Sequence, residues 1–206
     1  MSENLSRRNF LGKAYLYGGG LSLAMITRLP LAETAAAKSR KPESLSEIEW
    51  CAIEAMTGRI IPSEDSPGAI EANCVNFIDK ALAHEEKADL AMTQQSIAAL
   101  NQYSLARYKL VFCDCLPADQ DKLLIMLEDN QFENWPARAG QPAQFFAFVR
   151  ALTIMGFLAD PKYGGNRDFN GWRLAGYPGP RHHRGGYTDA QMMGKEVVVA
   201  VWETNK

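Results

Sequence analysis

The stretch from Gly156 to Gly179 constrains the fold more than any other part of the chain. It contains six glycines, two prolines and five aromatic residues. Because glycine and proline recur every few residues, the stretch cannot form one regular helix or strand, and something outside it must hold it in place. Its aromatic side chains supply apolar area with little rotamer entropy to lose, which favours a docking surface. The alternative is an ordered loop that folds back over helices of its own chain.

The N-terminus predicts an export signal over residues 1–37. Residues 6–13 read SRRNFLGK, a weakly apolar run follows over residues 14–26, and residues 35–37 offer small side chains for cleavage. This order is typical of a twin-arginine signal, which the twin-arginine translocase reads as an address. The alternative is a basic anchor helix, although about 13 apolar-leaning residues are too few to span a bilayer comfortably. The residues expected to carry the signal are Arg7, Arg8, Phe10 and Leu11.

The remaining residues, 38–206, are expected to form a single helical domain in the periplasm, free or bound through a complex to the periplasmic face of the inner membrane. A twin-arginine signal implies that the chain folds before export, as cargo with a cofactor or with a partner does. Without the signal the chain holds 18 Lys and Arg against 22 Asp and Glu, so its net charge is about −4. This acidic balance argues against nucleic acid as a partner.

Four cysteines follow the signal, namely Cys51, Cys74, Cys113 and Cys115. In an oxidising compartment they allow three pairings. If Cys113 and Cys115 lie on one helix, they point to nearly opposite sides and cannot bridge each other. A disulfide between Cys51 and Cys74 is then the feasible bridge within the chain. Buried free thiols, or a bridge to another chain, remain the alternatives.

Apolar residues at three- and four-residue spacing predict an all-α fold, a compact bundle of about five helices. The first should begin at a capping box of Ser46 and Glu49, and prolines should open the last two. Residues 161–206, with 7 basic and 4 acidic groups, should form a docking loop and an extended C-terminal arm. Residues 196–202 resemble a strand, which would add to another chain's sheet or pack as an apolar tail. The expected helices cover residues 46–60, the region of 75–82, residues 97–111, a short helix from 117 and a helix from about 142.

No catalytic, cofactor-binding or metal-binding constellation emerges from the residues. Asn166, Asp168 and Asn170 imitate the first half of a calcium loop, but Tyr177 stands where a bidentate Glu is needed. His182 and His183 are adjacent, so on an extended segment their side chains point apart, and flanking arginines disfavour a cation. One enzymatic alternative stays open, in which Asp168 acts with His182 or His183 in an independent exported enzyme.

These features resemble the gluconate 2-dehydrogenase subunit 3 family. The likeness lies in the signal, in Arg59-Ile-Ile-Pro62 followed by Pro67-Gly-Ala69, and above all in YGGNRD with the following Gly171-Trp172. The end of the chain, residues 181–206, departs from the family pattern and leaves the substrate open.

The resemblance implies a noncatalytic small subunit of a large flavin-dependent sugar or polyol dehydrogenase. The partner would hold FAD and oxidise a gluconate, glucose or glucoside type of sugar, and this chain would supply the export signal and stabilise the large subunit. Such complexes often include a third subunit with haem c, and the divergent end of this chain leaves open whether one is present here. The expected interface residues are Tyr163, Gly164, Gly165, Asn166, Arg167, Asp168, Trp172, Tyr177, His182 and His183.

Overall fold

The computed structural model describes residues 42–181 and 185–203. The predicted signal residues Arg7, Arg8, Phe10 and Leu11 lie outside this part, as do His182 and His183. The α-helices of the described part are α2 (Glu47–Ile60), α3 (Cys74–Ala83), α4 (Leu90–Tyr108), α5 (Pro117–Glu128), α6 (Pro142–Leu158), α7 (Asn170–Ala175) and α8 (Asp189–Met192). Short 3-10 turns are η2 (Lys87–Asp89), η3 (Phe112–Asp114), η4 (Ala137–Ala139), η5 (Pro161–Tyr163) and η6 (Arg167–Phe169).

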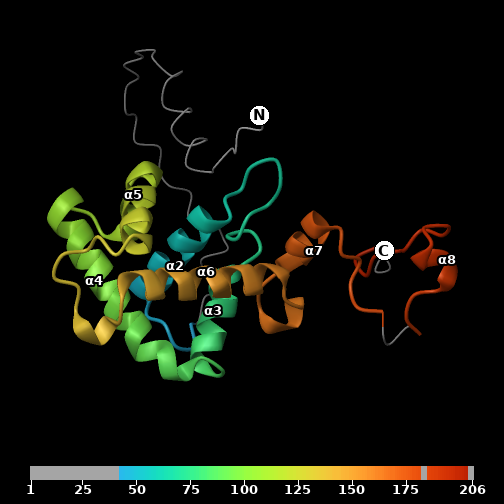
Figure 1. Ribbon diagram of the computed structural model, residues 1–206, viewed down its shortest axis with the longest axis horizontal. Helices are drawn as coiled ribbons and strands as arrows, with labels where there is room; N and C mark the ends of the chain where they lie inside the picture. Colours follow the sequence, from blue (N-terminus) through green and yellow to red (C-terminus); the bar gives the residue numbers. More distant parts are fainter. Residues whose placement is uncertain (1–41, 182–184, 204–206) are drawn as a thin grey trace, which may run out of the picture. The chain divides into compact units, whose positions relative to one another are not determined.

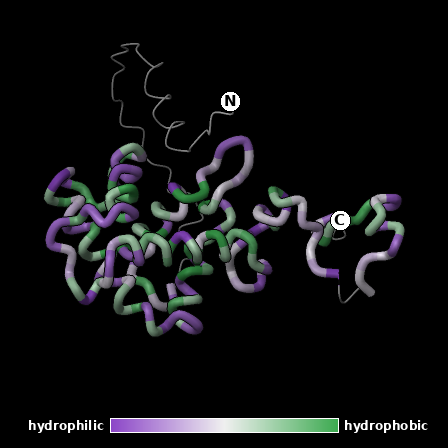
Figure 2. The backbone as a smooth tube through the Cα atoms, viewed as in Figure 1, coloured by the Kyte–Doolittle hydropathy of each residue, from purple (hydrophilic) through white to green (hydrophobic). Residues whose placement is uncertain are grey.

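Helix α6 is the common neighbour of the other long helices. It contacts α2, α3, α4 and α5, and Figure 1 shows it among them. The side chains between these helices form one hydrophobic core, while the loop that follows α2 is largely hydrophilic (Figure 2). The prediction of an all-α bundle of about five helices is therefore confirmed. The largest fully buried side chains are Phe112, Phe145, Ile53, Met56, Ile78, Leu82, Ile97, Leu100, Leu123, Leu127, Val75 and Val149.

Local signals in the sequence fix where the helices begin. At α2, the Glu49 carboxylate accepts a hydrogen bond from the Ser46 backbone N–H at 2.8 Å, as the capping box predicts. Pro117 and Pro142 each occupy the first turn of their helix, where a missing N–H costs no intrahelical hydrogen bond.

A buried carboxylate ties the segment before α2 to α3. Asp79 lies on α3 with almost no exposed surface. Its carboxylate accepts hydrogen bonds from the backbone N–H groups of Glu43, Ser44 and Leu45 at 2.6, 3.0 and 2.8 Å. Three charge-assisted hydrogen bonds compensate for burying the carboxylate and fix the point at which the chain enters the bundle.

Two predicted elements differ from the structure. Helix α4 ends at Tyr108 rather than near Val111, because Lys109 adopts a left-handed backbone with φ of 62°. The reversal lets Phe112 enter the core, where its N–H donates to the Asn101 side chain at 2.9 Å. The strand-like run 196–202 forms no strand, since no partner edge exists within the described residues.

The predicted disulfide between Cys51 and Cys74 is wrong, because Cys51 pairs with Cys113 across a Cα–Cα distance of 5.8 Å. The error follows from the early end of α4. Cys113 lies on the turn η3, which packs against α2, and not on a helix with Cys115. Cys74 is instead buried among Ala69, Ala72 and Phe157. Burial raises the pKa of the Cys74 thiol to about 12, so this thiol stays protonated at neutral pH.

The C51A/C113A variant should lose much of the free energy of unfolding. The bridge spans 62 residues, and the chain-entropy account gives about 4 kcal/mol for closing a loop of that length. Chemical denaturation of both proteins, with and without reductant, measures the loss. Reductant should destabilise the wild-type chain and leave the variant unchanged. Peptide mapping without reduction should recover residues 51 and 113 in one cross-linked species, and a cross-link between 51 and 74 would contradict the structure.

Candidate functional site

The loop that follows α6 turns back and packs on the end of that helix. Gly165 and Gly171 permit this close approach. A side chain at Gly165 would collide with the backbone carbonyl of Gly156, and one at Gly171 would collide with that of Phe157. Both glycines of the motif are therefore required by backbone packing inside this chain.

The Asn166 side chain holds the loop together through two hydrogen bonds. Its side chain is fully buried, donates to the Ala159 carbonyl at 2.8 Å and accepts from the Gly171 N–H at 2.8 Å. The Trp172 indole N–H donates to the Leu158 carbonyl at 2.7 Å, so it satisfies one of the backbone acceptors left open at the end of α6. The loop thereby caps the helix and buries Trp172, which is 6% exposed.

The same loop also binds the connection between α2 and α3. The Gly164 carbonyl accepts from the Asn76 side chain at 2.9 Å. Arg167 donates its backbone N–H to the Ala72 carbonyl at 3.0 Å and its side-chain Nε to the Glu71 carbonyl at 2.9 Å. Residues 88 to 96 positions apart in sequence are thus joined at one place.

The Glu71 carboxylate organises the loop on the other side of this junction. It accepts hydrogen bonds from the Ser63 hydroxyl and from the Gly68 N–H. The hydrogen bond from Ser63 is the main cause that holds the pKa of Glu71 below its ordinary value. The carboxylate is therefore ionised at neutral pH and keeps the turn between α2 and α3 closed.

These contacts separate the predicted interface residues by their exposure. The place of Gly165, Asn166 and Trp172 at a partner interface stays a prediction, although all three are buried within their own chain. The reason is that they satisfy the backbone of α6 and fill the space beside it. In contrast, Tyr163, Arg167, Asp168 and Tyr177 are exposed, and Gly164 is half-buried.

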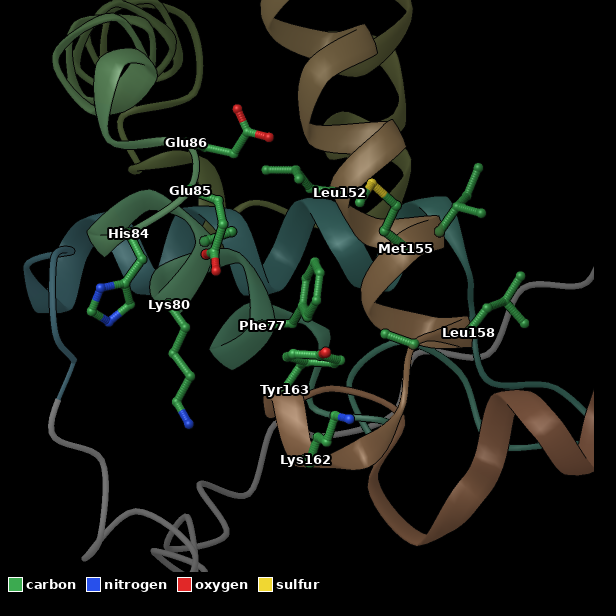
Figure 3. A pocket seen from close by; sticks show the side chains of 13 residues that line it. Phe77, Lys80, His84, Glu85, Glu86, Leu152, Met155, Leu158, Lys162 and Tyr163 are labelled. Carbon is green, nitrogen blue, oxygen red and sulfur yellow. The ribbon is translucent and has the colours of Figure 1, made fainter. Parts of the chain in front are cut away.

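Beside this loop, an apolar groove of about 670 Å³ runs between α3 and α6 (Figure 3). Phe77 and Tyr163 lie at its centre, and Leu152, Met155 and Leu158 line the side formed by α6. The volume falls within the range of small-molecule ligand pockets in proteins. The loop after α6 (residues 159–176, called the locked loop below) supplies Tyr163 and Lys162 to the groove, whose shape therefore depends on this loop.

Charged groups of opposite sign stand at the two ends of the groove. Figure 3 shows Glu85 and Glu86 at the end next to Leu152, and Lys162 at the end below Tyr163, with Lys80 along the α3 side. Lys80, Glu85 and Glu86 form no ion pair within the described residues. The His84 imidazole lies 3.3 Å from the Glu43 carboxylate.

The arm returns to the locked loop through its last described residues. The Trp202 ring lies 5.7 Å from that of Phe169, and the Arg173 guanidinium lies 5.1 Å from its centroid. The Val201 N–H donates to the Pro178 carbonyl at 2.9 Å. Met192, Met193 and Val197 remain strongly exposed.

Sequence reasoning missed the groove, although the sequence carried a signal for it. Arg150 is the only charged residue among the 17 residues of α6. A helix that is apolar on all faces is normally covered on all faces. Yet Ile154, Met155 and Leu158 are 47, 53 and 46% exposed.

Neither a metal site nor a membrane span is found in the described part of the chain. Within residues 42–181 and 185–203, no three His, Cys, Asp or Glu side chains are grouped to hold a metal ion. No helix in those ranges has the length and apolar character to cross a membrane. Asp168 adopts a left-handed backbone with φ of 57°, and its carbonyl accepts from Arg173 at 3.0 Å.

Replacing Asn166 with Ala should lower the free energy of unfolding by about 3 kcal/mol, because it leaves the buried Gly171 N–H and the Ala159 carbonyl unpaired. Asn170→Ala is the matched control, since the Asn170 side chain makes no hydrogen bond within the described residues. It should change stability by less than about 0.5 kcal/mol. Denaturant titration measures the free energy of unfolding of both variants. Equal values would contradict a stabilising role for the two Asn166 hydrogen bonds.

Comparison with known proteins adds one match. The model of the family described as gluconate 2-dehydrogenase subunit 3 matches residues 47–179. This range begins at the first residue of α2 and ends just after the locked loop, so it includes the groove and leaves out the arm. No curated protein and no solved structure matches the chain significantly. Because the match covers well over half of the sequence, the chain belongs to the gluconate 2-dehydrogenase subunit 3 family.

Proposed function

We propose that the chain is the noncatalytic small subunit of an exported, flavin-dependent sugar dehydrogenase. It carries the twin-arginine signal for the complex and stabilises the large subunit by binding to it. The family description, which names a subunit of a dehydrogenase, supports this proposal. The oxidised sugar is of the gluconate, glucose or glucoside type.

The observation that carries the proposal is the uncovered apolar face of α6. Three large aliphatic side chains, Ile154, Met155 and Leu158, stand about half-exposed side by side with the exposed Tyr163. Contiguous apolar surface on a folded protein marks a site of interaction. Removing such a surface from water is the main driving force for protein association.

The other components of the complex follow from the family resemblance. The large subunit holds FAD, complexes of this family often add a third subunit with haem c, and no residue of this chain is assigned to either cofactor. The complex resides in the periplasm, where it associates with the periplasmic face of the inner membrane. The exposed motif residues Tyr163, Arg167 and Asp168 and the neighbouring Tyr177 lie at or near the interface, together with His182 and His183.

The competing function is an independent enzyme that uses Asp168 with His182 or His183. No observation in the described residues favours it, because the two histidines lie outside them and Asp168 is exposed on a surface turn. We therefore keep it as the outcome that the following experiment distinguishes.

The experiment is to purify the full chain with a C-terminal tag from its host under gentle conditions. We expect a large flavoprotein to co-purify, with an absorption spectrum of bound flavin and with dye-linked oxidation of a sugar. A haem spectrum in the same fraction identifies the third component. A colourless chain that is active alone would establish the independent enzyme, and a chain that is alone and inactive would contradict the proposal.

Ile154→Glu should lower the yield of the complex about tenfold or more, because it places a charge in a surface that the partner buries. Ile125→Glu on α5 is the matched control. Its side chain is 48% exposed against 47% for Ile154, and it lies outside the groove. Co-purification of the large subunit, normalised to the amount of tagged chain, measures both. If the two variants retain the partner equally, the face of α6 is not the interface.

A further inference from the structure

Resting on the proposed function, we propose that the groove between α3 and α6 receives one amphipathic helix of the large subunit. That helix presents an apolar face to the groove, with acidic side chains at the end over Lys80 and Lys162 and basic side chains at the end over Glu85 and Glu86. The occupant thus has a defined chemistry and a defined direction of charge.

The walls of the groove favour a helix over other peptide shapes. An extended peptide that adds to a sheet needs an exposed strand edge, and residues 42–181 and 185–203 contain no strand. Both walls are α-helices, and a third helix packs between two others by fitting its side-chain ridges into their grooves. The aliphatic lining from Leu152, Met155 and Leu158 suits the apolar stripe of such a helix, and Met155 can adapt to the shape of the partner side chains.

The charges at the ends of the groove set the direction. Lys80, Glu85 and Glu86 have no ion-pair partner within the described residues, and Lys162 has only Asp160 at 3.9 Å. When a helix with acidic side chains over Lys80 and Lys162 and basic side chains over Glu85 and Glu86 enters the groove, each of these groups gains a partner of opposite charge as water leaves. A helix in the opposite order meets like charges at both ends, which disfavours that order.

The position of the groove also suits it to contact a large partner. It lies within the part of the chain that the family model matches, and its lower end is built by the locked loop through Lys162 and Tyr163. The Lys162 ammonium lies 4.9 Å from the centroid of the Tyr163 ring, which holds the cation at the edge of the apolar floor.

The first test places a photo-crosslinking amino acid at three positions of the full chain and assembles each variant with the large subunit. Position 162 marks the basic end, position 86 the acidic end, and position 125 on α5 is the control. We expect positions 162 and 86 to label opposite ends of one helical segment of the large subunit, acidic at the first site and basic at the second, and position 125 to label none of it.

The second test reverses charges. K80E/K162E should weaken the complex about tenfold at low salt, and the difference should shrink as salt screens the pairs. K109E/R138E is the control, because it changes the net charge equally at exposed positions outside the groove. Circular dichroism establishes that all variants remain folded.

The outcomes separate this inference from the proposed function. If the wild-type chain binds no large subunit, the proposed function fails. If the complex forms but the groove positions label no partner peptide, or label a second copy of this chain, the groove inference alone is overturned. A groove occupied by a co-purifying lipid without a peptide label, or K80E/K162E binding as tightly as its control, overturns it as well.

Discussion

The two hydrogen bonds of the buried Asn166 side chain fix the course of the loop that follows α6. They join the Ala159 carbonyl to the Gly171 N–H, so the chain must turn back at the end of the helix. The turn is tight enough that Gly165 and Gly171 touch the helix backbone. A buried amide without partners is costly, so these two hydrogen bonds stabilise this arrangement of the loop. The fixed loop also holds the connection between α2 and α3 through Arg167.

Fixing the loop has a consequence for the surface. The loop covers the end of α6 with Trp172 but leaves the flank of the helix open beside α3. On that flank the chain exposes aliphatic side chains from a helix with a single charge, Arg150. The most specific sequence motif thus packs inside the chain, and an apolar groove stays open beside it. This arrangement suits the groove to binding a partner. In the proposed complex the motif would act on the interface by positioning Lys162 and Tyr163, which line the groove.

Much of the fold could be predicted from local chemistry, because capping at Ser46 and the prolines at 117 and 142 act within one turn of the chain. The end of α4 could not, since Lys109 adopts its left-handed backbone to admit Phe112 to a core assembled from distant helices. The wrong disulfide followed from that error. Likewise, the composition of the loop identified it as important but could not tell whether Trp172 packs inward or outward. That distinction depends on the carbonyl of Leu158, which only the folded chain brings near.

The most direct test of the central claim is the structure of the assembled complex by electron cryo-microscopy. The account predicts that Ile154, Met155 and Leu158, about half-exposed in the chain alone, become buried against the large subunit. Ile125, the control position on α5, should stay as exposed in the complex as it is in the chain alone. Trp172 should keep its contacts within this chain. A complex in which the flank of α6 stays in solvent while another surface holds the partner would contradict the account.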